Sequence, residues 1–300
     1  MLMTKTVFIT IAGKTNAGKS SLLNALIGEK IASVSSKSQT TKTKITGVVN
    51  IAETQLVFID TPGLHKAKNR LSEYMLKAVR ESASDIDAVF FVADCTKKMG
   101  DQEKEMLRSV SASKTPLVLI LNKIDLLKDK TALAQTIAEL SSEFNFDAVI
   151  PISVLENDGI DLVREKALSL AVEGPHFFPE DAITDQPEKI IAGEIVREKL
   201  LELLDDEVPH GIAVVVESMK EREDKDLLDI SAVIYCERDS HKGIVIGKGG
   251  RMLKRAATLS RKELEEFFQI KVNLQCWVKV KEDWRNREAI IRSLGLSDNN

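Results

Sequence analysis

The sequence contains few cysteines and no long hydrophobic run. Its three cysteines, Cys95, Cys236 and Cys276, are widely spaced and odd in number, and none belongs to a CxxC pair. This usage is typical of reduced thiols in a reducing compartment and argues against a thiolate metal site. No apolar stretch reaches about 18 residues, and the N-terminus lacks the order of a signal peptide. We therefore expect a cytoplasmic protein without a membrane-spanning helix.

The charge of the chain is unevenly distributed. The formal net charge is −4, yet residues 241–285 hold eleven Lys or Arg against five Asp or Glu, and the remainder holds 31 against 41. A charge-rich stretch is usually a solvated surface. Here the cations concentrate around a glycine-rich loop, which favours a polyanionic partner.

The order of apolar and amphipathic segments predicts two domains, which also suits a chain of 300 residues. Up to residue 172, apolar runs alternate with amphipathic segments of helical length, as in an α/β fold with a mostly parallel, doubly wound sheet. The predicted strands are TVFITIAG, ITGVVNIA, TQLVFIDTPG, DAVFFVADC, PLVLILNKID and DAVIPIS. The predicted helices lie near residues 19–28, 70–83, 101–112, 129–143 and 159–171.

The segment EGPHFFPEDAITDQP contains three of the seven prolines and interrupts this pattern. We interpret it as a linker. The residues after it predict a small α+β module. Its elements are a helix at 188–204, strands at 211–219 and 227–236, a glycine-rich turn with its helix, the strand KVNLQCWVKV and a short last helix. The predicted domains are 1–172 and 188–300, with the linker at 173–187.

The stretch GKTNAGKS fits the pattern GxxxxGK[ST], between a predicted strand and a predicted helix. Loop N–H groups at a helix N-terminus bind phosphate, Lys19 can neutralise the β and γ oxygens, and the Ser20 hydroxyl can bind Mg²⁺. A chance glycine-rich turn is the alternative, and the correct flanks disfavour it. The predicted nucleotide contacts in this loop are Gly13, Asn16, Ala17, Gly18, Lys19, Ser20 and Ser21.

The motif DTPG, residues 60–63, also follows an apolar strand. Asp60 can reach Mg²⁺ through water and the Gly63 amide can meet a γ-phosphate, although alone the motif is a common turn. The Ser- and Thr-rich segment 33–44 can close over a nucleotide, with Thr41, or else Thr40, completing the Mg²⁺ shell. The predicted catalytic residues are Lys19, Thr41, Asp60 and Gly63. The predicted metal-binding residues are Ser20, Thr41 and Asp60.

The motif NKID, residues 122–125, indicates which base is bound. Guanine offers N1–H and N2–H₂ donors that one carboxylate, Asp125, can accept, while Asn122 can bond the N7/O6 side and the Lys123 stem can lie over the ring. Adenine lacks that donor pair, so GTP is favoured over ATP. Ser153, with the amide of Val154, is predicted to contact guanine O6, although a routine strand-to-loop turn is the simpler interpretation.

A second glycine-rich loop lies in IVIGKGGRMLKRAA. No Ser or Thr follows its GK, so it does not suit a triphosphate with Mg²⁺. The order of helix, GxxG turn and helix is similar to the KH signature, whose loop clamps the backbone of single-stranded RNA; alone, GxxG is usually a helix break. The predicted RNA-binding residues are His241, Gly247, Lys248, Gly249, Gly250, Arg251 and Lys254.

The motifs GxxNxGKS, QTT, DTPG and NKxD resemble the translation-factor-related GTPases, and with the KH-like module the chain resembles the Era family nearly end to end. Departures from the family pattern are Lys14, Thr15, Ala17, Lys42, Lys44 and Val154, and none removes a phosphate or base ligand. The resemblance implies a type II-like KH domain. It also implies a factor of small ribosomal subunit assembly that binds small-subunit rRNA near its 3′ end, with some peripheral association at the inner face of the membrane. We expect a monomer.

Two features of the GTPase motifs bear on turnover. Leu64 stands where Ras-like enzymes carry a water-positioning Gln, so hydrolysis should be slow alone. Asn16 is similar to a residue of relatives that use K⁺ as a catalytic charge, which predicts K⁺ beside Mg²⁺.

Three functions remain open: a GTPase switch that gates RNA binding, an RNA-binding or chaperone protein that binds GTP with little hydrolysis, and a nucleotide kinase. A kinase gives NKID and DTPG no role. Trp277 and Trp284 could suggest base stacking, but burial in the protein is the stronger expectation for both.

Overall fold

The structure is a computed structural model that describes residues 3–34, 44–61, 86–112, 115–205 and 208–294. Its described residues form two compact units. Residues 3–32, 44–61 and the described residues between 86 and 185 make up the first unit. Residues 33–34 and the described residues from 186 onward make up the second. The predicted helix at 70–83 lies outside the described residues.

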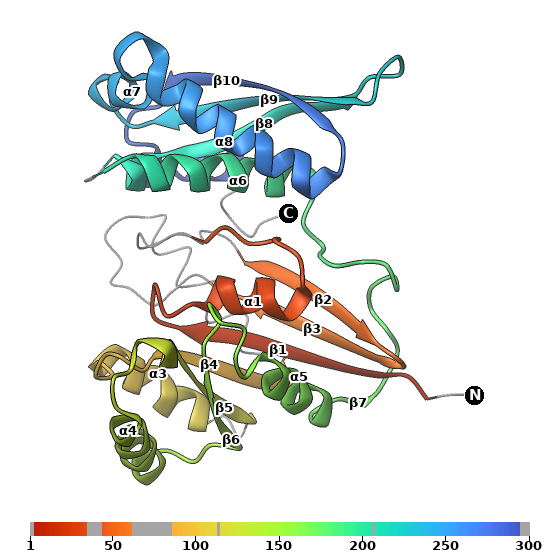
Figure 1. The fold of residues 1–300 in the computed structure, drawn as a ribbon, viewed down its shortest axis with the longest axis vertical. Helices are drawn as coiled ribbons and strands as arrows, with labels where there is room; N and C mark the ends of the chain where they lie inside the picture. The colour runs from red at the N-terminus through yellow and green to blue at the C-terminus, as the bar shows by residue number, and fades with distance from the viewer. Residues whose placement is uncertain (1–2, 35–43, 62–85, 113–114, 206–207, 295–300) are drawn as a thin grey trace. The chain divides into compact units, whose positions relative to one another are not determined.

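The first unit is built on a seven-stranded sheet (Figure 1). The strands follow the order β2-β3-β1-β4-β5-β6, and β7 pairs with β1. All pairings are parallel except β2 with β3 and β7 with β1. The strands are β1 (Lys5–Gly13), β2 (Ile45–Ile51), β3 (Thr54–Asp60), β4 (Ala88–Asp94), β5 (Leu117–Asn122), β6 (Ala148–Ile152) and β7 (Val172–Glu173).

Helices cover both faces of this sheet, which explains why its central strands are apolar throughout. One buried cluster joins the sheet to α1 and α5, and a second joins it to α3 and α4. The helices are α1 (Lys19–Ile27), α3 (Asp101–Ala112), α4 (Lys130–Glu143) and α5 (Ile160–Ser169). The predicted mostly parallel, doubly wound α/β fold is confirmed.

The register of the strands brings distant motifs to one edge of the sheet. Asp94 at the end of β4 pairs with Asn122 at the end of β5, and Asn122 pairs with Ile152 at the end of β6. Ligands of open α/β sheets bind at the carboxyl ends of their strands. The sequence motifs that follow β1, β3, β5 and β6 therefore meet at the same edge.

Most of the predicted linker is hydrogen-bonded to the first unit, residues 173–175 beside β1 and residues 177–184 along β2 and β3. The Gln55 side chain donates to the Phe178 carbonyl at 2.9 Å and accepts from the Phe177 and Phe178 amides at 2.8 and 3.0 Å. The Val48 amide donates to the Ile183 carbonyl at 2.8 Å. The domain boundaries at 172 and 188 stay a prediction.

The second unit is an α+β module whose three-stranded sheet has the order β10-β9-β8. Strand β9 is antiparallel to β8 and parallel to β10. The strands are β8 (Ala213–Glu221), β9 (Leu227–Cys236) and β10 (Lys271–Val280). The helices are α6 (Glu188–Leu203), α7 (Asp239–Ile246), α8 (Arg251–Phe268) and the short α9 (Glu288–Ser293). Strand β8 begins two residues later than predicted, because Pro209–Gly211 forms a 3₁₀ turn.

The two tryptophans of this unit differ in environment. Trp284 is fully buried, as predicted, and its indole donates to the Gly211 carbonyl at 3.0 Å. The expectation of burial is wrong for Trp277, which is 58% exposed. Trp277 lies on β10, one of the two edge strands of this sheet, among the side chains that alternate with those packed on the helices.

Among the described residues, no helix has both the length and the apolar character needed to cross a bilayer.

Candidate functional site

The phosphate loop between β1 and α1 depends on two glycines. Gly13 has a φ of 142°, and a Cβ there would lie 2.2 Å from the Val92 carbonyl oxygen on β4. Gly18 caps α1 with a φ of 100°, and a Cβ there would lie 2.1 Å from the Asn122 amide nitrogen. A larger residue at position 13 would collide with the backbone of β4, and one at position 18 with the Asn122 side chain.

Lys19, the first residue of α1, is 6% exposed, and its ammonium donates to the Lys14 carbonyl at 3.2 Å. Burial lowers the pKa of Lys19, and the nearby Asp60 carboxylate opposes that shift. A bound polyphosphate would stabilise the charged form of this buried ammonium at the helix N-terminus. Ser20 and Ser21 follow it in the first turn of α1.

Asp60 meets the phosphate loop directly. It is fully buried at the end of β3, and its Oδ2 accepts a 2.6 Å hydrogen bond from the Ser20 hydroxyl. A hydroxyl and a carboxylate side by side next to a phosphate-binding loop are the hard oxygen donors that Mg²⁺ prefers. The residues present therefore fit the predicted Mg²⁺ site. Thr41 and Gly63, predicted for the same site, lie outside the described residues.

Asn122 connects the base motif to the phosphate loop. It is 4% exposed, and its amide nitrogen donates to the Ala17 carbonyl at 2.9 Å. Its amide oxygen accepts from the Lys123 and Val154 backbone N–H groups at 2.8 and 3.2 Å. Val154 therefore contacts Asn122 here, and its predicted contact with guanine stays a prediction.

Lys123 is held in a left-handed conformation, with a φ of 73°. Its ammonium donates to the Asn16 carbonyl and to Asp94 Oδ2, both at 2.8 Å. Asn16 also has a positive φ, 63°. These contacts hold the lysine stem extended between the phosphate loop and the end of β4.

Asp94 is a site residue that the sequence motifs did not indicate. Burial alone would raise its pKa, but hydrogen bonds from Lys123, Thr96 and Lys97 outweigh burial and lower the pKa to about 2. Asp94 is thus ionised at neutral pH beside Lys123. The available signal was its position, since it ends a strand at the register of Asn122.

Asp125, the predicted base-reading carboxylate, is half-buried in the short 3₁₀ turn after β5. Its Oδ1 accepts a 2.6 Å hydrogen bond from the Ser153 hydroxyl. Ser153 is 1% exposed, and its backbone forms a bridge with Asp158 that fixes the loop after β6. Ser153 therefore orients the carboxylate.

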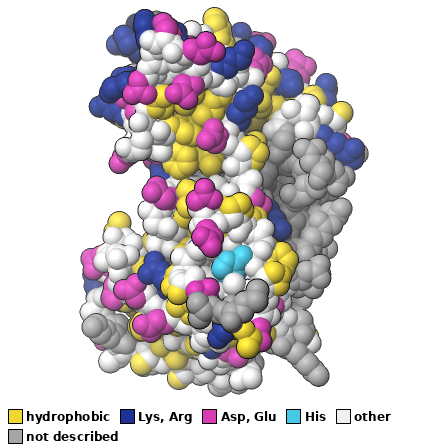
Figure 2. Space-filling model, turned by 90° about the vertical axis from the view of Figure 1, so that its right-hand side faces the viewer, with side chains coloured by type: hydrophobic (Ala, Val, Ile, Leu, Met, Phe, Trp, Pro, Cys, Tyr) yellow, Lys and Arg dark blue, Asp and Glu magenta, His cyan; other side chains and the backbone are white. Residues whose placement is uncertain are grey.

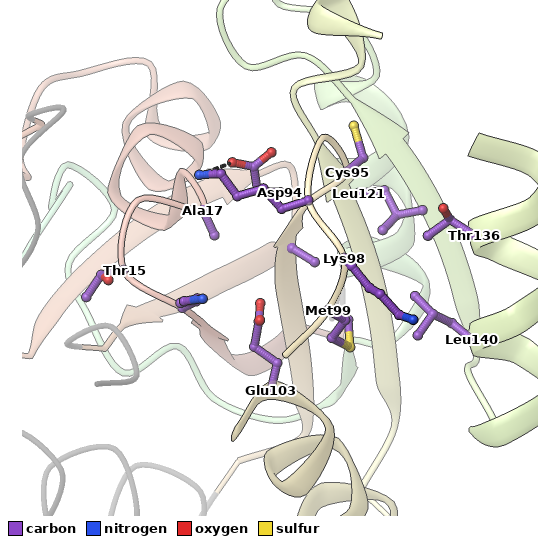
Figure 3. Close-up of a pocket in the computed structure, with 13 residues that line it drawn as sticks. Thr15, Ala17, Asp94, Cys95, Lys98, Met99, Glu103, Leu121, Thr136 and Leu140 are labelled. Atoms are coloured by element: carbon purple, nitrogen blue, oxygen red, sulfur yellow. Dashed lines mark ion pairs between the residues drawn. The ribbon is translucent and has the colours of Figure 1, made fainter. Parts of the chain in front are cut away.

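A small cavity lies beside the phosphate loop (Figure 3). Thr15 and Ala17 line it from the loop, Cys95 and Met99 from the segment after β4, and Leu140 from α4. Its volume is about 70 Å³. Its lining includes none of the residues predicted to bind the γ-phosphate, Mg²⁺ or the base, such as Lys19, Ser20 and Asp125, so this cavity is not that site.

The second glycine-rich loop connects α7 to α8. Gly247 has φ 72° and ψ 170°, a conformation restricted to glycine, and a Cβ there would lie 2.6 Å from the Met252 Cβ. Gly249 and Gly250 also have positive φ, 61° and 74°, but a Cβ on either would meet no atom within 4 Å. The loop is therefore fixed at its start and open at its tip.

Cations surround this open tip. Lys248, Arg251 and Lys254 are exposed, as is Arg255. On the face of the molecule in Figure 2, Lys and Arg side chains gather over part of the second unit. His241 is half-buried and its ring lies close to Gly211. Its predicted contact with RNA stays a prediction.

Comparisons with known proteins identify both units. A family model described as a 50S ribosome-binding GTPase matches residues 8–123, and a KH domain model matches residues 207–285. The GTPase Era of Ruminiclostridium cellulolyticum is 49% identical over 98% of each chain. The chain belongs to the GTPase Era family. The GTPase Era of Clostridioides difficile is 46% identical over 99% of this chain and all of that one.

Solved Era structures match the fold over nearly the whole chain. Era in complex with MgGDPNP and nucleotides 1506–1542 of 16S ribosomal RNA gives a TM-score of 0.93 at 35% identity, covering 98% of this chain and 99% of that one. A variant of Aquifex aeolicus Era bound to GDP.AlF4⁻ gives 0.94 at the same identity and coverage. As an Era family member, the chain is a GTPase with a C-terminal KH domain, which confirms the predicted family and fold.

Proposed function

We propose that this GTPase is a switch that binds single-stranded small-subunit rRNA near its 3′ end through its KH domain and acts in assembly of the small ribosomal subunit. The solved relative bound to a 16S rRNA segment supports this assignment. The observation that carries it is the contrast between the two loops. Lys19 is enclosed beside Asp60, as a compact triphosphate requires, whereas Gly249 opens to solvent among exposed cations, as an extended polymer requires.

In the first unit, the roles follow from the contacts. Lys19 neutralises the β and γ oxygens while loop amides cradle them, and Ser20 with Asp60 would hold Mg²⁺, whose charge favours phosphoryl transfer. Asp125 accepts the two guanine donors with its carboxylate, held by Ser153. We further propose that Thr41 and Gly63 contact Mg²⁺ and the γ-phosphate.

Other family properties stay proposals for this chain. We propose cytoplasmic monomers, with peripheral association at the inner face of the membrane. We also propose a catalytic K⁺ near Asn16. Single-turnover hydrolysis should then be faster in KCl than in NaCl, and equal rates would remove K⁺ from the mechanism.

Paired substitutions test the two-ligand assignment. Lys19→Ala should abolish GTP binding, and Gly249→Asp should weaken binding of an RNA of nucleotides 1506–1542 with GTP affinity unchanged, because an anion then faces the phosphates. Calorimetry with each ligand measures both. Parallel loss of both ligands in either variant would contradict separate sites, and retained micromolar GTP affinity in Lys19→Ala would refute the role of Lys19.

The second candidate function is an RNA-binding or chaperone protein that binds GTP with little hydrolysis. It is favoured only by Leu64, which replaces the water-positioning Gln and lies outside the described residues. Single-turnover hydrolysis with and without RNA separates the two functions, since absence of phosphate release in both cases would support the second.

A further inference from the structure

The sheet of the KH domain has one face packed on helices and one face turned away from them. Strand β10 shows the alternation clearly. Its side chains in the core of the unit are Val272, Leu274, Cys276 and Val278. The intervening side chains, on the other face, are Lys271, Asn273, Gln275, Trp277 and Lys279. Helices α7 and α8 both pack against β10, so this strand belongs to the same module as the GxxG loop.

Trp277 is the exposed aromatic side chain of this face. More than half of it is accessible, whereas Trp284 is completely enclosed. An indole is a large, mostly apolar group that normally contributes buried area to a fold. Leaving Trp277 in water therefore forgoes a stabilising contact and suggests that a ligand covers it.

Along β10 the neighbours of Trp277 are polar and basic, whereas its partner across the strand pair, Val233 on β9, is fully buried. On the same face, Gln275 and Lys279 lie two residues away on either side, at a spacing of about 7 Å. The segment 271–281 contains three lysines and no acidic residue. Lys279 meets Glu217 on β8 at 3.4 Å, but both side chains are about half exposed, so the pair is weak.

These surroundings favour a nucleic acid over a protein. Protein partners dock on contiguous apolar patches with charge kept to the rim. Exposed apolar surface does not continue from Trp277, because Val233 beside it is fully buried and its neighbours along β10 are an amide and a cation. Proteins that bind single strands combine aromatic rings, on which bases stack, with cations that follow the backbone.

We propose that Trp277 is a stacking platform for a base of single-stranded RNA, with Lys279 and Lys271 beside the backbone phosphates. The proposal rests on the function proposed above. The proposed RNA surface extends from the GxxG loop onto the solvent face of β10. Stacking on that face would add affinity that depends little on the RNA sequence.

Affinity and its salt dependence test the proposal. The probe is an RNA of nucleotides 1506–1542 of 16S rRNA, titrated at several KCl concentrations. Trp277→Ala should weaken binding about tenfold with an unchanged salt slope, because stacking releases no counterions. Lys279→Ala should lower the slope by about 0.7. Trp277→Phe should retain most of the affinity, since a smaller ring still stacks.

Controls separate this proposal from the function on which it rests. Leu162→Ala on α5 removes a side chain of similar exposure, 55%, and should change no RNA parameter. GTP affinity and circular dichroism establish that each variant is folded. If wild-type protein does not bind the RNA, the proposed function fails. If wild-type protein binds and Trp277→Ala binds equally well, stacking on Trp277 is wrong. If Trp277→Ala binds the RNA as wild type does but no longer binds a protein of the small ribosomal subunit that wild type binds, the face contacts a protein instead.

Discussion

At the scale of single residues, the nucleotide site depends on side chains that hold other groups of the site in place. Asp94 holds Lys123, Ser153 holds Asp125, and Asn122 holds Ala17 of the phosphate loop. Each supporting contact fixes a group that the motif assigns to the nucleotide. The site is thus preorganised by these contacts, and loss of Asp94, which no motif assigns to the nucleotide, should weaken binding through Lys123 alone.

Substitution of Asp94 tests this support. Asp94→Asn should weaken GTP and GDP binding about 5- to 10-fold. This is less than the about 1.5–3 kcal/mol of a charged hydrogen bond, because Asn can still accept a hydrogen bond and Lys123 keeps its contact with Asn16. Stopped-flow measurement should place the loss in the dissociation rate, with the single-turnover hydrolysis rate unchanged. Asp94→Glu should partly restore binding, and Asp129→Asn, at the exposed start of α4, is the matched control.

The same residue predicts a pH dependence. Because the folded pKa of Asp94, about 2, lies below its ordinary value of 3.8, its contribution to stability is present above pH 4 and is lost as the pH falls toward 2. The difference in unfolding free energy between wild type and Asp94→Asn should be constant from pH 7 to 5 and smaller at pH 3. Urea denaturation at pH 7, 5 and 3 measures this difference. A difference at pH 3 as large as that at pH 7 would contradict the low pKa of Asp94.

Substitution of Asp125 tests base selectivity. Asp125→Asn should shift preference from GTP toward XTP by roughly 100-fold, because the C2 oxygen of xanthine accepts where guanine donates. Competition binding with the two nucleotides measures the ratio. Ser153→Ala should weaken GTP binding, since the carboxylate loses the hydrogen bond that orients it; the predicted contact of Ser153 with guanine O6 stays a prediction.

At the scale of elements, each unit has its own core. Helix α8 packs Ala256 and Leu264 against the sheet of the KH domain, whereas α1, α3, α4 and α5 pack on the other sheet. Damage to one core should therefore leave the other sheet and its ligand intact.

Leu264→Ala tests that separation. The truncation should destabilise the KH domain by about 2–5 kcal/mol, because Leu264 is completely buried. Both tryptophans lie in this domain, so their fluorescence in urea follows its unfolding alone. GDP affinity in the absence of urea should be unchanged. A parallel loss of GDP binding would show that the units fold as one.

Sequence patterns predicted the helices and strands well, because the periodicity of apolar residues and the motifs at strand ends depend only on residues close together in the chain. They missed features that depend on which strands become neighbours. Asp94 could be assigned only once β4 was known to lie beside β5. Trp277 was expected to be buried, whereas its exposure follows from the face of β10 on which it lies, opposite the side chains that pack in the core. The contacts of the Gln55 amide with residues 177 and 178 are likewise invisible in a linear pattern.

At the scale of the whole molecule, a switch requires that the nucleotide and RNA sites affect each other. A nonhydrolysable GTP analogue should change RNA affinity by a factor of about 5 to 150, and RNA should change affinity for the analogue by the same factor. Titrations in both orders measure the two factors. Affinities that are independent in both orders would show that two modules share a chain without coupling.

The close approach of Gly18 to Asn122 has a consequence for protein engineering. Since the Asn122 amide fills the space where any β-carbon at position 18 would stand, these two positions form one unit of design although more than a hundred residues separate them. A phosphate loop transplanted into another scaffold without its matching asparagine would lose the hydrogen bond from the Asn122 side chain to the Ala17 carbonyl. Chimeras that move both positions together should therefore keep nucleotide binding where single-loop grafts lose it.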